Sequence, residues 1–96
     1  MATSSIIKEF LTEDKSAPSV SVNSKEFVRL AINVSKSGYT PIGVLAIAKS
    51  GASSGYCVIS GFNFDASKTT LYVDVVNTFT STATVIAVAT ILYRKS

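Results

Sequence analysis

The chain has 96 residues, enough for one small domain, which removes only about 60–65% of its unfolded surface from water. Nine Lys and Arg against six Asp and Glu give a net charge of +3, but the basic residues are scattered, and the absence of a basic stripe argues against a nucleic-acid partner. Histidine is absent, which removes every Ser-His or Cys-His nucleophilic system and the commonest zinc ligand.

The first 18 residues differ in composition from the rest of the chain. They contain five of its 15 charged residues, within positions 8–15, together with four large apolar residues, Ile6, Ile7, Phe10 and Leu11. The segment lacks the basic start and apolar run of a signal peptide. We expect residues 1–18 to form an arm that attaches the protein to a partner. The alternative is that they supply the first strand of the domain.

Residues 19–96 have the pattern of an all-β domain. Residues 19–22 fit a short edge strand, and in residues 27–34 the period of two places Val28, Leu30, Ile32 and Val34 on one face. Further strands are expected at residues 42–48, 56–64, 69–76 and 83–94, with loops at 35–41, 49–55, 65–68 and 77–82. Strands at such short intervals predict a small antiparallel β-sandwich, similar to a jelly roll, of six to seven strands.

The last expected strand is apolar on both faces. Val85 lies in one row, and Ile86 and Val88 lie in the other. Its apolar part, residues 83–93, is too short for a membrane-spanning helix. Because 47% of the residues are apolar, with a mean hydropathy of +0.38, we expect Val85, Ile86 and Val88 to form a subunit interface of a homo-oligomer. A well-packed monomer is the alternative.

Few residues suggest chemistry. Residues 51–55 match G-x-S-x-G, but the nucleophile elbow needs a strand-turn-helix setting and a histidine. Asp65 and Asp74 flank turns, where aspartate commonly makes local hydrogen bonds, and Cys57 reads as a small core residue. The sequence therefore predicts no catalytic residue, metal or cofactor. Most phenylalanines are expected in the core, namely Phe27, Phe62, Phe64 and Phe79.

Two tyrosines suggest a ligand-binding loop. Tyr39 and Tyr56 both fall in or beside expected loops, where an exposed ring can stack on a sugar. This placement is the basis of one rival prediction, a carbohydrate-binding module with a host-surface glycan as its ligand. The alternative is that Tyr39 packs its loop back onto the sandwich.

Two segments carry a resemblance to a known family. Residues 35–44 (SKSGYTPIGV) and the ending at residues 90–96 (TILYRKS) resemble the small β module of phage and prophage particle proteins, as does Asn77-Thr78 before the last strand. The resemblance spans residues 27–96. It implies a β-sandwich, usually trimeric, displayed on a virion surface, and it supplies no catalytic residues.

From this resemblance we expect a non-enzymatic virion protein, assembled in the host cytoplasm, that contacts capsid or tail proteins. Because the chain begins at its own Met1 without a preceding shaft, decoration of the capsid is favoured over the receptor-binding tip of a tail fibre.

Overall fold

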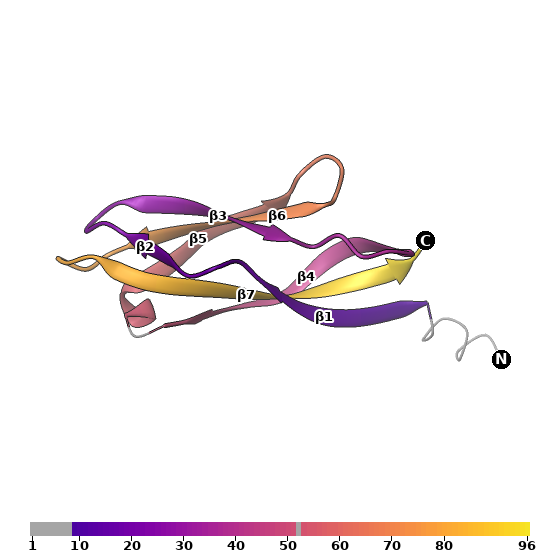
Figure 1. The fold of residues 1–96 in the computed structure, drawn as a ribbon, viewed down its shortest axis with the longest axis horizontal. Helices are drawn as coiled ribbons and strands as arrows, with labels where there is room; N and C mark the ends of the chain where they lie inside the picture. The colour runs from indigo at the N-terminus through magenta and orange to yellow at the C-terminus, as the bar shows by residue number, and fades with distance from the viewer. Residues whose placement is uncertain (1–8, 52) are drawn as a thin grey trace.

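The computed structural model describes residues 9–51 and 53–96 (Figure 1). Within these residues the chain forms seven β-strands and one short 3-10 helix, which confirms the expected all-β fold. The described residues contain no helix that is long and apolar enough to cross a membrane. In chain order the elements are β1 (Phe10–Ser16), β2 (Val20–Val22), β3 (Phe27–Asn33), β4 (Tyr39–Ser50), η1 (Ser54–Tyr56), β5 (Cys57–Phe64), β6 (Thr70–Asn77) and β7 (Ala83–Lys95).

The strands form two antiparallel sheets. In the first sheet β7 is central, with β4 along one edge and β1 followed by β2 along the other. In the second sheet the order is β3-β6-β5. The domain is elongated, about 56 × 23 × 18 Å, and β7 runs through most of its length (Figure 1).

The N-terminal segment belongs in part to the first sheet. β1 pairs with β7 over its whole length, from Phe10 opposite Arg94 to Ser16 opposite Val88. The expectation of an arm separate from the sandwich is therefore wrong for residues 10–16, and the first-strand alternative holds there. Leu11 packs against the core because it alternates with the outward Phe10. Ile6 and Ile7 lie outside the described residues.

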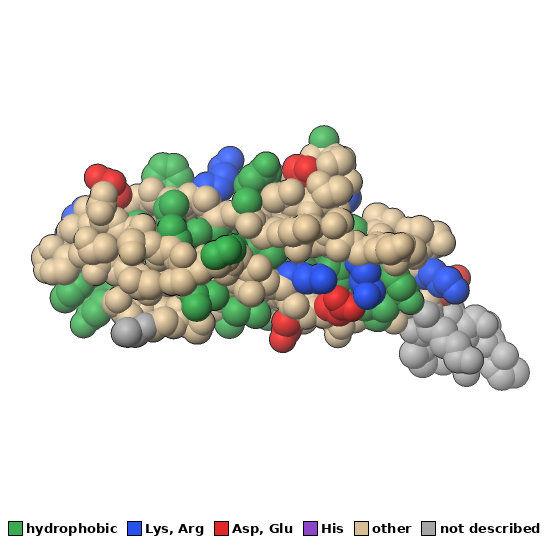
Figure 2. Space-filling model, in the orientation of Figure 1, with side chains coloured by type: hydrophobic (Ala, Val, Ile, Leu, Met, Phe, Trp, Pro, Cys, Tyr) green, Lys and Arg blue, Asp and Glu red, His purple; other side chains and the backbone are tan. Residues whose placement is uncertain are grey.

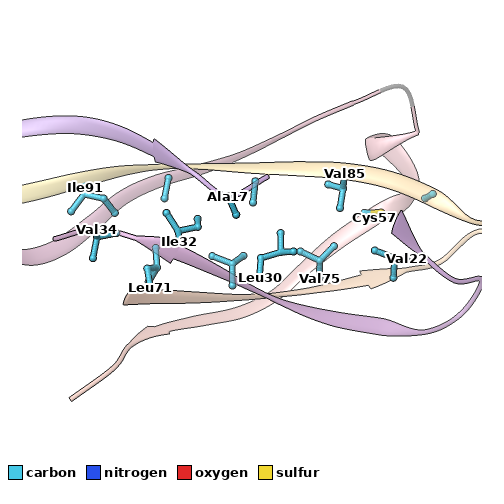
Figure 3. Packing of buried hydrophobic residues seen from close by; sticks show 14 of the residues in the cluster. Ala17, Val22, Leu30, Ile32, Val34, Cys57, Leu71, Val75, Val85 and Ile91 are labelled. Carbon is cyan, nitrogen blue, oxygen red and sulfur yellow. The ribbon is translucent and has the colours of Figure 1, made fainter. Parts of the chain in front are cut away.

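The core lies between the inner faces of the two sheets (Figure 3). The period-two pattern of β3 holds, since Leu30, Ile32 and the following Val34 are buried while Val28 is half-buried. A fully buried side chain of this size stabilises the fold by about 1.5–3 kcal/mol. Besides Pro41, fifteen apolar residues are buried in the described part of the chain: Ala17, Val22, Leu30, Ile32, Val34, Cys57, Leu71, Val73, Val75, Ala83, Val85, Ala87, Ala89, Ile91 and Tyr93.

β7 has two different faces. The row containing Val85 and Ile91 is fully buried between the sheets, whereas Ile86 and Val88 are half-buried on the outer face. The prediction that Val85 contributes to a subunit interface is therefore wrong, because the core of its own chain covers this side chain. For Ile86 and Val88 a role in subunit contact stays a prediction.

Two phenylalanines expected in the core are exposed. Phe27 is 64% exposed because it shares the outward face of β3 with Arg29, out of phase with the buried row. Phe62 is 51% exposed although its register partner, Val73, is buried. Phe64 does pack against the core.

Candidate interaction surface

The sandwich is incompletely closed between β4 and β5. These two strands are edge strands of different sheets, and a hollow of about 240 Å³ lies between them. We call this surface the open flank and define it by the residues that line the hollow: Val44, Leu45, Ala46, Ile47, Ile59 and Phe62. All six side chains are apolar.

Several residues of the open flank belong to the inner faces of the sheets. Val44 and Ile47 of β4 lie opposite the buried Ile91 and Ala89 of β7. Ile59 of β5 likewise lies opposite the buried Val75 of β6. These three side chains pack against the core but are only half-buried. The margin of the core therefore reaches the surface on this side of the molecule.

Two β-bulges direct large side chains of β4 outward. The register between β4 and β7 shifts between Pro41 and Gly43 and again between Val44 and Ala46. The residues inserted at these shifts are Ile42, which is 44% exposed, and Leu45, which is 59% exposed. A bulge re-aims a side chain and interrupts the regular edge of a strand. The bulge at Leu45 therefore adds exposed apolar surface at the hollow, whereas Ile42 lies beside Arg94 and Lys95 near the end of β7.

The edge strands of the open flank are almost uncharged. β4 and β5 have 12 and 8 residues, and Lys49 is their only charged residue. The Lys49 ammonium group is already engaged, because it donates a hydrogen bond to the carbonyl of Cys57. A partner that fits this surface is expected to be apolar and uncharged as well.

Charged residues gather instead at the opposite edge of the first sheet. The Glu13 carboxylate lies 2.7 Å from the Lys36 ammonium group and 3.2 Å from that of Lys15. These two cations hold the pKa of Glu13 below its usual range, and Lys36 has the larger effect. Figure 2 shows charged side chains of both signs side by side over β1. The two long edges of the molecule therefore differ in chemistry.

The two candidate sugar-binding tyrosines do not form one site. Tyr39 is the first residue of β4, not part of a loop as expected, and it is half-buried against the core with the Lys36 ammonium 5.6 Å from its ring centre. Tyr56 ends η1 beyond the other end of β4 and is 46% exposed. Its ring stacks on Phe79 with centroids 3.8 Å apart. Because β4 alone is about 36 Å long, a single small glycan cannot contact both rings.

Of the two aspartates expected to make local hydrogen bonds beside turns, Asp65 does so and Asp74 does not. Asp65 accepts from the backbone N–H groups of Thr69 and Thr70 and from the Ser67 hydroxyl, which lowers its pKa. Asp74 lies within β6 and not beside a turn, and it pairs with Arg29 at 2.7 Å. Among the described residues no group of three or more potential metal ligands comes together.

The G-x-S-x-G match also has a structural role. Ser53 accepts a hydrogen bond from the backbone N–H of Thr84 at 3.1 Å, and Gly51 lies against the same residue. A Cβ added to Gly51 would come within 2.9 Å of the Thr84 carbonyl oxygen, and its φ of 115° also favours glycine. This loop therefore packs on the start of β7.

The sequence-based analysis did not identify the open flank. Residues 42–48 form an unbroken apolar run, which gives no indication of the bulges that expose Ile42 and Leu45. One usable signal was the absence of charge from residues 39–48 and 56–64.

No protein-family model matches the chain. Comparisons with curated proteins and with solved structures also find no similar protein.

Proposed function

We propose that this protein is a non-enzymatic structural subunit of a bacteriophage particle, displayed on the capsid surface as a homotrimer. The observation that carries the proposal is the relation between the two segments that resemble the phage module. Residues 39–44 and 91–95 pair with each other as the ends of β4 and β7, with Tyr39 opposite Lys95 and Val44 opposite Ile91.

Further contacts join these two segments. The backbone N–H of Ser96 donates to the Gly38 carbonyl at 2.9 Å, and the hydroxyls of Thr40 and Ser96 are hydrogen-bonded at 2.9 Å. The segments that resemble the phage module are thus parts of one structural unit. This supports a common architecture over a chance similarity of two short stretches.

The open flank supports a role in assembly. A chain of this length has little core of its own, and here the margin of that core is uncovered along one side. Assembly with other copies would cover it. The polar side chains first considered for chemistry make structural contacts: Asp65 shapes a turn, and Asp74 pairs with Arg29.

Immunogold electron microscopy tests the location of the protein. Antibodies against the purified chain are applied to particles released by the strain that encodes it. We expect labelling over the whole capsid surface. Labelling confined to the tail tip would move the protein to the alternative of a tail-fibre tip. The proposal fails if the protein is found in the cells and the particles carry no label.

A glycan array addresses the remaining alternative, a carbohydrate-binding module. A capsid decoration protein should show no saturable binding to sugars. Saturable binding that disappears in a Tyr56→Ala variant would favour the carbohydrate-binding module, because Tyr56 is the more exposed of the two candidate tyrosines.

A further inference from the structure

We propose that a second hollow, at one end of the sandwich, binds a phosphate group. This hollow has a volume of about 290 Å³ and lies where the loop at residues 34–38 meets the turn at residues 65–69. It is separate from the open flank, with which it shares no lining residue. The inference goes beyond the proposed function and does not depend on it.

Two tripeptides of the same composition line this hollow. Ser35-Lys36-Ser37 follows β3, and Ser67-Lys68-Thr69 precedes β6. They come together because the two strands are antiparallel, and the N–H of Val34 donates to the carbonyl of Thr69 at 2.9 Å. The remaining lining residues, 39–41, add no charge. The described residues around the hollow therefore include two lysines and no carboxylate.

Lys68 brings a positive charge that has no ion-pair partner in the described part of the chain. Its ammonium group lies 6.0 Å from the centre of the Phe64 ring. Asp65, the nearest acidic residue in sequence, already accepts hydrogen bonds from the N–H of Thr70 and the hydroxyl of Ser67. An anion in the hollow would supply the ion pair.

Lys36 also keeps donors for a ligand, although it is paired with Glu13. The Glu13 carboxylate is shared between Lys36 and Lys15, so this cluster has two cations and one anion. An ammonium group has three N–H donors, and the pair with Glu13 does not use them all. The ring of Tyr39, 5.6 Å from this ammonium group, forms part of the same wall.

The turn that presents Lys68 is held in place by the protein itself. Lys68 has a φ of 59°, and its N–H donates to the Asp65 carbonyl at 3.1 Å. The hydroxyls on either side, those of Ser67 and Thr69, donate to the Asp65 carboxylate at 2.8 Å and 3.2 Å. A site that is already ordered costs less entropy when a ligand binds.

The arrangement suits phosphate better than a carboxylate ligand. Donors approach from two sides, with Lys68 on the turn and Lys36 and the exposed Ser37 on the loop. A phosphate ester carries a charge of about −1.5 to −2 at pH 7 and has three strong acceptor oxygens. A carboxylate has one charge and two oxygens in one plane. One phosphate group can therefore contact both tripeptides at once.

Titration of the 15N-labelled full chain with inorganic phosphate, followed by NMR at constant ionic strength, tests the proposal. A second arm uses glycerol 1-phosphate. We expect saturable shifts of the backbone amide signals of residues 35–37 and 67–69. Tighter binding of glycerol 1-phosphate would identify a phosphate ester as the natural ligand, and tighter binding of inorganic phosphate would identify the free ion.

Lys68→Gln should raise the dissociation constant for phosphate about tenfold, and Lys68→Arg should restore binding, because the charge is what the ligand contacts. Lys25→Gln is the matched control. Lys25 likewise has a positive φ, of 62°, but it lies in the turn at the other end of β3. This variant should bind phosphate as the wild type does.

The same spectra show whether each variant is folded. If Lys68→Gln does not fold, Ser37→Ala replaces it, and this variant should weaken binding about threefold. The inference is overturned by the absence of saturable shifts with both probes, by equal affinity for acetate, or by equal effects of Lys68→Gln and Lys25→Gln. It is also overturned if Ser37→Ala, used as the replacement, leaves the affinity unchanged. Because the titration uses the isolated protein, its failure is distinguishable from failure of particle labelling.

Discussion

The hydroxyl of Tyr93 donates a 2.7 Å hydrogen bond to the carbonyl oxygen of Val34, across the space between the two sheets. Both residues are fully buried. Val34 follows β3 in the second sheet and Tyr93 lies near the end of β7 in the first, so one side chain fixes the spacing of the sheets at this end. The bond also satisfies a backbone acceptor that water cannot reach.

We expect Tyr93→Phe to lower the free energy of unfolding by about 1–3 kcal/mol, because the Val34 carbonyl loses its buried partner. Urea unfolding followed by circular dichroism measures this. Burial, and secondarily the Glu13 carboxylate, raises the pKa of Tyr93. The stability that depends on this proton is fully present below the unfolded-state pKa of about 10 and is lost as pH rises through the folded-state pKa. Tyr93→Phe should weaken this alkaline loss, and an unchanged alkaline profile would contradict the assignment.

Asn77 is the only polar residue buried in the described part of the chain. Its amide nitrogen donates to the carbonyls of Val22 and Ser81, and its amide oxygen accepts from the N–H of Phe79. We expect Asn77→Ala to cost about 2–3 kcal/mol, since the buried carbonyl of Val22 and the part-buried backbone groups of Ser81 and Phe79 lose their partners at once. The exposed Asn63 of β5 is the matched control, and Asn63→Ala should change the urea midpoint little. Equal effects would contradict this role for Asn77.

The Asp65 turn makes stability depend on pH in acid. The hydrogen bond from the backbone N–H of Thr70 has the largest effect in lowering the pKa of Asp65, and the bond from the Ser67 hydroxyl comes next. The folded state therefore favours the carboxylate. This stabilisation is present above the unfolded-state pKa of about 4 and is lost as pH falls through the lower folded-state pKa. Asp65→Asn should lower the melting temperature at pH 7 and show a smaller further loss down to pH 2. Parallel curves for the two proteins would show that the turn does not depend on the charge.

Adjacent residues of β7 should respond differently to the same substitution. Val85→Asp places an unpaired charge in the core, which costs several kcal/mol and should unfold the domain. Ile86→Asp changes the outer face, where the side chain is half-buried, and the protein should remain folded. Circular dichroism and thermal unfolding separate the two outcomes. A folded Val85→Asp variant would contradict the sheet arrangement described above.

The fold could be predicted where one face of a strand is apolar and the other polar. In β3 the alternation identified Leu30 and Ile32 as core, and the same alternation would have placed Phe27 with Arg29 on the outside. The pattern failed where bulges change the phase, at Ile42 and Leu45. It also gave no indication that β4 and β5 would leave the core open, because the pairing of sheet edges depends on contacts between segments distant in sequence.

The last prediction concerns β1, for which the sequence left two alternatives open. Deleting residues 2–17 removes the whole strand and exposes one edge of β7, the central strand of the first sheet. It also removes Leu11, which packs on the core, and the hydrogen bond from the Thr90 hydroxyl to Asp14. We therefore expect the truncated protein to lose cooperative thermal unfolding and to aggregate, since an unpaired apolar edge promotes association between chains.

A shorter deletion serves as the control for this experiment. Removing residues 2–8 leaves β1 and all of its pairing with β7 intact, so this variant should unfold cooperatively near the wild-type temperature. Differential scanning calorimetry compares the three proteins at equal concentration. If the protein lacking residues 2–17 still melts cooperatively at the wild-type temperature, β1 contributes nothing to the stability of the sandwich. The segment would then act as the separable attachment arm, and its loss should abolish binding to particles while leaving the fold unchanged.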